Sequence, residues 1–175
     1  MSVTVTSWQL KGLALASDNT APRVGHVHLK VADLDRAIAF YSGLLGFGLT
    51  QRYGDQAAFL GAGGYHHHIG LNTWHSAGGH PPAKENTGLY HSAFLYPDRQ
   101  ALAKVVVKVR DAGVDIYGSA NHGVSEAFYF DDPDGNGVEI YWDKPQDDWP
   151  RNEDGSLAMY NAHFEVEDWL ARVLT

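Results

Sequence analysis

The sequence predicts an α+β fold built from two successive β-α-β-β-β modules. Two stretches read as similar opening strands, residues 24–31 and 89–95, and each carries a histidine two residues from its start, at His26 and His91. After each stretch the spacing of apolar residues changes from that of a strand to that of a helix. This repeated order indicates a duplicated unit.

The first module spans residues 24–74, and one amphipathic helix follows its opening strand. Asp33 is the candidate N-cap of this helix, and Gly46 is its candidate end. Between them the apolar residues recur at helical spacing, at Leu34, Ala37, Ile38, Tyr41, Leu44 and Leu45. Three strand-like segments separated by Gly- or Asp-containing turns follow, around residues 48–52, 57–60 and 68–74.

The second module spans residues 88–143 and repeats the same order of elements. Its helix is predicted from Asp98 to about Gly113, with an apolar stripe at Leu102, Val105, Val106 and Val109. Three strands complete the module, near residues 114–117, 125–130 and 137–142.

Three segments lie outside these modules. Residues 1–23 form an N-terminal lead, and residues 75–87, which include Gly-Gly-His-Pro-Pro, have the composition of a linker. Residues 144–175 form a C-terminal tail that begins as a polar stretch. A short helix is predicted near its end, over residues 165–174, and its apolar side indicates a packing or dimer-contact element.

Whole-chain composition narrows the function classes. With 175 residues, 44% of them apolar, the chain suits one compact domain with a sizeable core. The formal charge of −8 and the lack of a Lys/Arg cluster argue against nucleic acid as a partner. No segment reaches the roughly 18 apolar residues of a membrane span, so we expect a cytoplasmic protein with no membrane partner. Without cysteine, any metal must be bound by nitrogen and oxygen donors, and ten histidines can supply the nitrogen.

His26, His91 and Glu139 are the candidate metal ligands. Glu139 stands at the centre of an otherwise apolar strand, where an unpaired buried carboxylate would cost several kcal/mol, so a cation is expected nearby. Two histidines and one carboxylate are the ligand set of non-haem Fe(II) sites that keep positions open for substrate and oxygen. Two alternatives stay open: Glu139 could face solvent, and His28, on the same strand face as His26, could be the ligand instead.

Two motifs resemble those of the vicinal oxygen chelate superfamily. They are His-x-His-Leu-x-Val-x-Asp-Leu-x-x-Ala-x-x-Phe-Tyr from His26 and Asp-Pro-Asp-Gly-Asn-x-x-Glu ending at Glu139. This superfamily includes glyoxalase I, fosfomycin and bleomycin resistance proteins, and extradiol dioxygenases, and the resemblance covers residues 24–143. It implies that the two modules form a curved, barrel-like mixed sheet around a metal cavity, with ligands from both modules at His26, His91 and Glu139.

Within the superfamily, the resemblance is greatest to extradiol dioxygenases of the catechol 2,3-dioxygenase type. Gly70 stands where glyoxalase I has a fourth, glutamate ligand, which favours a three-ligand site. Residues 64–74 are similar to a segment of the extradiol enzymes and imply that His67 is the active-site base. Strand alternation would turn His66 and His68 away from it. The resemblance also implies that Tyr129, ten residues before Glu139, assists the reaction.

The function implied is Fe(II)-dependent extradiol, or meta, cleavage of a catechol-type aromatic ring by dioxygen, with Mn(II) as a possible metal. His122 is a candidate second-sphere hydrogen bonder, a role also open to His28. The alternatives are another metal-dependent enzyme of this fold, such as a glyoxalase-like lyase or isomerase or a resistance protein, and a non-catalytic small-molecule binding protein. Many extradiol enzymes have two double-module domains and this chain has one, so a homodimer or higher homo-oligomer is expected.

Overall fold

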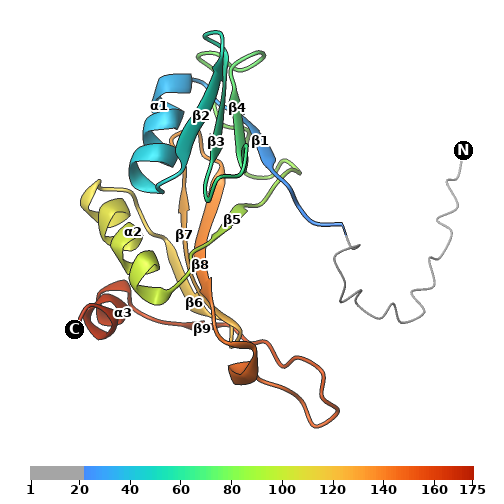
Figure 1. The fold of residues 1–175 in the computed structure, drawn as a ribbon, viewed down its shortest axis with the longest axis vertical. Coiled ribbons are helices and arrows are strands. Elements are labelled where there is room, and N and C mark those ends of the chain that lie inside the picture. The colour runs from blue at the N-terminus through green and yellow to red at the C-terminus, as the bar shows by residue number, and fades with distance from the viewer. Residues whose placement is uncertain (1–21) are drawn as a thin grey trace, which may run out of the picture.

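The computed structural model describes residues 22–175, and the predicted lead lies outside the described residues except for its last two positions. The chain forms two mixed sheets with their helices on one side (Figure 1). The strand orders are β1-β4-β3-β2 and β5-β8-β7-β6-β9. In each module the opening strand pairs in parallel with the last one, and the other pairs are antiparallel.

The predicted α+β class and the two β-α-β-β-β modules are therefore confirmed, but the single curved, barrel-like sheet is not. Each sheet ends at its opening strand, because β1 pairs with β4 and β5 pairs with β8. Within residues 22–175 no ladder joins β1 to β5, so the strands form two separate sheets.

The first module follows the prediction closely. It consists of β1 (Val27–Lys30), α1 (Leu34–Ile38), the π-helical turn η1 (Ala39–Leu44), β2 (Gly48–Tyr53), β3 (Ala57–Gly61) and β4 (Ile69–Asn72). Asp33 caps α1, since its Oδ1 accepts a hydrogen bond from Arg36 N at 3.0 Å. The predicted helix keeps its extent but changes to π geometry at Ala39.

One strand of the second module differs from the prediction. The elements are β5 (Ser92–Leu95), α2 (Arg99–Asp111), β6 (Gly118–Asn121), β7 (Ser125–Asp131) and β8 (Gly137–Asp143). The strand predicted near residues 114–117 forms four residues later, as β6. Val114 and Ile116 pack against the core without joining a ladder, so their apolar pattern marks burial and not strand pairing.

The tail adds three elements, η2 (Gln146–Asp148), β9 (Ala162–His163) and α3 (Val166–Val173). The predicted short helix is confirmed as α3, and it packs through Trp169 and Leu170, which are both buried. β9 pairs antiparallel with β6 and was not predicted, because a strand of two residues carries no readable periodicity.

A buried contact joins the two modules. Tyr41 Oη in η1 donates a hydrogen bond to Asp132 Oδ2 at 2.9 Å, across 91 positions of sequence. Burial raises the pKa of Tyr41, as does the neighbouring Asp132 carboxylate, so the phenol stays protonated. The Asp-Pro-Asp-Gly-Asn motif thus binds the turn before Glu139 to the first module. Asp134 adds a second contact between the modules, since its Oδ1 lies 2.6 Å from Arg36 Nη2.

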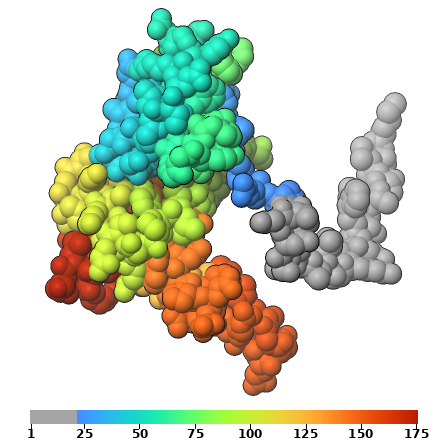
Figure 2. Space-filling model, in the orientation of Figure 1, coloured from blue at the N-terminus to red at the C-terminus, as the bar shows by residue number. Residues whose placement is uncertain are grey.

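The surface is uneven, and the tail between β8 and β9 extends away from the modules (Figure 2). None of the helices in residues 22–175 is long and apolar enough to cross a membrane.

Candidate active site

Glu139 lies on the face of the second sheet that points away from α2. Because side chains alternate along β8, Val138 and Ile140 are fully buried in the core and Glu139 projects from the opposite face. The carboxylate is only 12% exposed. It therefore needs polar partners on the sheet surface.

Two side chains contact this carboxylate, and a third contacts one of these two. His91 Nε2 lies 2.9 Å from Glu139 Oε2. Tyr129, which pairs with Glu139 across β7 and β8, donates from its Oη to Glu139 Oε1 at 3.1 Å. His122 Nε2 lies 2.7 Å from the same phenol oxygen. We call His91, His122, Tyr129 and Glu139 the Glu139 cluster.

The hydrogen bonds define where protons lie in the Glu139 cluster. A phenol has one proton, and Tyr129 donates it to Glu139, so His122 must carry its proton on Nε2 to donate to the phenol oxygen. Burial and the Glu139 carboxylate raise the pKa of Tyr129, which keeps the phenol neutral. Tyr117 lies nearby, and burial together with Asp131 raises its pKa to about 12.

The donor chemistry of the Glu139 cluster fits part of a metal site. The imidazole nitrogen of His91 and the carboxylate of Glu139 are the donor types that Fe(II) and Mn(II) accept. In the described part of the chain, His91 Nδ1 is buried and has no hydrogen-bond partner, whereas a metal-bound histidine usually has one there. Among residues 22–175, no group of three or more His, Asp or Glu side chains is arranged to hold a metal ion.

The other predicted site residues gather on the first module. The rings of His26 and His67 lie 4.5 Å apart between centroids, so the predicted third ligand and the predicted base are neighbours. Partial burial lowers the pKa of His67, and so do the neighbouring imidazoles of His26 and His66. The structure thus places the predicted site in two parts, one on each module.

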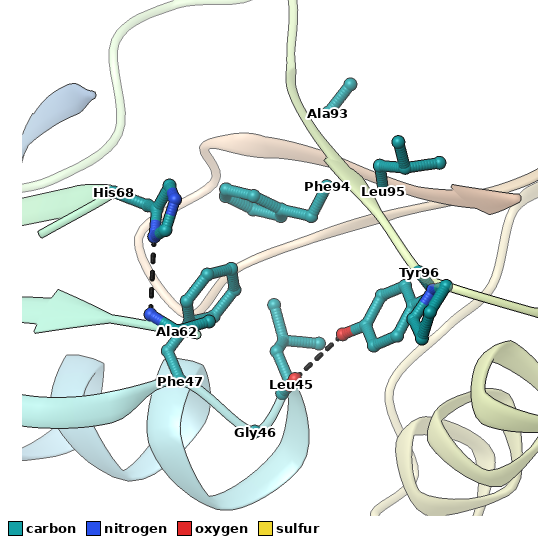
Figure 3. A pocket seen from close by; sticks show the side chains of 10 residues that line it. Leu45, Gly46, Phe47, Ala62, His68, Ala93, Phe94, Leu95 and Tyr96 are labelled. Carbon is teal, nitrogen blue, oxygen red and sulfur yellow. Dashed lines mark hydrogen bonds between the residues drawn. The ribbon is translucent and has the colours of Figure 1, made fainter. Parts of the chain in front are cut away.

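Two expectations about the histidine triplet are resolved by the structure. His66 does not point away from His67, because their Nδ1 atoms lie 2.6 Å apart. Both residues precede β4, and alternation does not apply in this turn. His68 does turn elsewhere: Ala62 N donates to its Nδ1 at 3.3 Å, and its ring faces Phe47 (Figure 3).

His28 occupies the space in front of Gly70. A Cβ on Gly70 would lie 2.9 Å from His28 Cγ, so the imidazole packs directly against the glycine backbone. The ring also lies 5.6 Å from that of Trp74 and 6.1 Å from that of Phe59, between centroids. His28 therefore takes part in an aromatic contact group on the first sheet.

The Glu139 cluster faces a cavity of about 390 Å³. Its lining consists of Tyr90, His91, Tyr117, Gly118, Ser119, Ala120, His122, Tyr129, Asn161 and His163. A second cavity of about 390 Å³ lies between the modules and is mostly apolar (Figure 3). We assign the site to the first cavity, because it borders three members of the Glu139 cluster.

Sequence reasoning missed Asn161 and His163. The side chain of His163 is 67% exposed, yet it lines the cavity. Both residues reach the cavity through the pairing of β9 with β6, for which the sequence offers no signal.

Paired β-α-β-β-β modules, each a mixed sheet with its opening strand parallel to its last strand, define the fold class of this chain. The chain belongs to the Glyoxalase/Bleomycin resistance protein/Dioxygenase superfamily, whose family model matches residues 23–140.

Two curated relatives are dioxygenases. The chain is 36% identical over 147 residues to Catechol-2,3-dioxygenase of Bacillus subtilis (strain 168), covering 84% of this chain and 50% of the relative. It is 32% identical over 125 residues to Biphenyl-2,3-diol 1,2-dioxygenase 3 of Rhodococcus globerulus, covering 70% of this chain and 64% of the relative. The chain therefore spans about half to under two thirds of the length of these relatives.

Solved structures share the fold. A glyoxalase/dioxygenase from Nostoc punctiforme has a TM-score of 0.61 and 24% identity, covering 76% of this chain and 98% of its own. A domain from Frankia sp. EAN1pec, described as glyoxylase/bleomycin resistance protein/dioxygenase, has a TM-score of 0.59 and 24% identity, covering 71% of this chain and 100% of its own.

Proposed function

We propose that the protein is an Fe(II)-dependent extradiol ring-cleaving dioxygenase that acts on a catechol-type aromatic diol. The observation that carries this proposal is the Glu139 cluster, in which the carboxylate accepts from Tyr129 and faces His91 at the edge of a cavity. The similarity to two diol dioxygenases supports the same reaction class.

In this proposal His91, Glu139 and His26 hold the metal ion. Fe(II) in such a site would bind both diol oxygens, lower their pKa and provide redox access to dioxygen, and Mn(II) has the same ligand preference. The proposal requires His26 to come to the His91–Glu139 pair. Since His26 and His67 are in contact, His67 would arrive at the same side of the substrate.

Side chains of the protein accept, hold and orient the protons of the proposed reaction. His67 takes a proton from the diol as general base, a role that needs only hydrogen-bond reach in the bound state. Tyr129 holds a proton on Oη at the cavity, between the Glu139 carboxylate and His122. His122 fixes the direction of the phenol, as a second-sphere partner does.

A second copy of the chain supplies the first-module histidines in this proposal. Among residues 22–175 both opening strands are sheet edges, and unpaired edges are places where chains associate. Large apolar side chains near these edges are exposed, with Leu95 56%, Val24 86% and Tyr90 89% accessible. Covering them in a homodimer would remove this apolar surface from water.

The test is anaerobic loading with Fe(II), addition of catechol, and then admission of air. Oxygen uptake together with a yellow ring-opened product is the expected result. If no vicinal diol causes oxygen uptake by the iron-loaded protein, the proposed reaction is wrong.

A further inference from the structure

The tail in front of α3 forms one wall of the cavity. Asn161 and His163 line it together with three members of the Glu139 cluster, and both lie beyond residue 140, where the match to the family model ends. We propose that residues 160–163 are a specificity element that contacts the ring substituent of the diol and favours an uncharged, ring-sized group. This inference rests on the proposed function and names its substrate class.

Backbone and side-chain contacts fix this wall to β6. His163 pairs with Ala120 in the β6–β9 ladder, and its Nδ1 lies 3.0 Å from the carbonyl oxygen of Ser119, to which it must donate. Tyr160 N donates to the carbonyl oxygen of His122 at 3.2 Å. The wall is therefore tied to the segment that carries a member of the Glu139 cluster.

The turn after His122 is packed against the same tail. Gly123 has a φ of +83°, and a Cβ there would lie 2.7 Å from Pro150 Cγ and 2.8 Å from Tyr160 Cε1. The contact is possible only because glycine has no side chain. The tail thus holds a fixed position beside the cavity.

The width of the sheet sets which substrates can reach the wall. Glu139 lies on β8, and β7 and β6 separate β8 from β9. Three strand spacings of about 4.8 Å place the wall on the order of 14 Å from the strand of Glu139. A single-ring diol held at Glu139 would contact the Glu139 cluster alone, whereas a substituent the size of a second ring extends toward Asn161 and His163.

The charges around the wall disfavour an acidic substituent. Glu165 Oε1 lies 3.2 Å from His163 Nε2, and Asp131 accepts from Tyr117 Oη at 3.2 Å. Neither carboxylate lines the cavity, but each is bonded to a side chain that does, so their negative charge opposes an anionic group on the substrate. The aromatic ring of Tyr117 and the amide of Asn161 instead suit an uncharged aromatic group with or without polar atoms.

Anaerobic calorimetry on the Fe(II)-loaded full chain tests this with three ligands: catechol, 3-phenylcatechol and 3,4-dihydroxyphenylacetate. The wild type is expected to bind 3-phenylcatechol most tightly. Asn161→Ala and His163→Ala should each lower the affinity for 3-phenylcatechol roughly 3- to 10-fold. The affinity of each variant for catechol should stay within about twofold of that of the wild type. Asn86→Ala and His80→Ala, in the exposed linker, are the matched controls and should leave all three affinities unchanged.

Each other outcome has a defined meaning. If both variants lose affinity equally for catechol and 3-phenylcatechol, or if neither loses affinity, residues 160–163 are not a specificity element. Tightest binding of the acidic ligand by the wild type overturns the charge argument. A wild type that binds no diol refutes the proposed function itself, which separates the two failures.

Discussion

Tyr129 and Glu139 face each other across β7 and β8, and the phenol donates to the carboxylate at 3.1 Å. The ten-residue separation has a simple structural cause. A tight turn through Asp132 and Asn136 joins the two strands, so residues ten apart become direct cross-strand neighbours. The spacing therefore places a neutral proton donor beside a candidate metal ligand.

Replacing Tyr129 separates proton handling from metal binding. In Tyr129→Phe we expect unchanged iron content, because the proposed ligands remain, and a kcat roughly 100-fold lower, because a positioned proton donor is lost. Glu139→Gln should lose most of its iron. Iron analysis and oxygen uptake measure the two effects. Equal iron loss in both variants would show that Tyr129 acts by supporting the ligand.

His26 and His28 are expected to differ in their effect on iron. His26→Ala should weaken iron binding strongly, and His28→Ala should retain it, because His28 packs on Gly70 and near Trp74. Iron titration followed by metal analysis checks this prediction. The opposite order would assign the ligand to His28.

A mixing experiment tests whether two copies share the site. His26→Ala and Glu139→Ala chains should each be inactive alone and should partly recover oxygen uptake when they are unfolded and refolded together. Recovery requires a site with donors from two chains. If the mixture stays inactive while each variant still forms the oligomer, all three donors must come from one chain.

Gly137→Ala should impair both folding and iron binding. A Cβ at Gly137 would contact the Tyr90 carbonyl and lie 3.1 Å from His91 Cβ, so the start of β5 would have to move. We expect a loss of about 1–3 kcal/mol in the free energy of unfolding. Gly43→Ala is the control, since no other part of the described structure beyond its own helix lies within 4 Å of the added Cβ. Urea unfolding and iron titration of both variants test this prediction. An unaltered iron affinity in Gly137→Ala would contradict the expected effect on iron binding.

Glu126 is predicted to be a stability residue and not a site residue. It is buried, and its Oε2 accepts from Trp169 Nε1 and from Arg99 Nε, both at 2.8 Å. Glu126→Ala would leave both donors unpaired, and we expect a loss of about 2–3 kcal/mol, since Arg99 is partly exposed. Asp111→Ala removes an exposed pair with Arg110 and should leave the free energy of unfolding nearly unchanged. Comparable losses in the two variants would argue against the buried contact.

The parts of the site that lie on regular strands could be predicted from the sequence. Alternation placed Glu139 opposite Val138 and Ile140, and the structure shows this arrangement. Capping by Asp33 could also be predicted, because an N-cap acts through a local hydrogen bond.

The parts that depend on turns and on distant pairing could not be predicted. His66 lies in a turn, where the two-residue period has no meaning, and β9 exists only because β6 offers it an edge. How the sheets are placed relative to each other is also set by contacts such as Tyr41 with Asp132, which no local pattern records.

The bond between Tyr41 and Asp132 has a consequence for the protein as a duplicated unit. Each half holds a buried group whose partner belongs to the other half, so a cut in the exposed linker would yield two fragments with orphaned polar atoms. We therefore expect the separated halves to be unstable alone and to recover their structure on being combined. The two modules thus share the same order of elements, but neither is expected to be stable without the other.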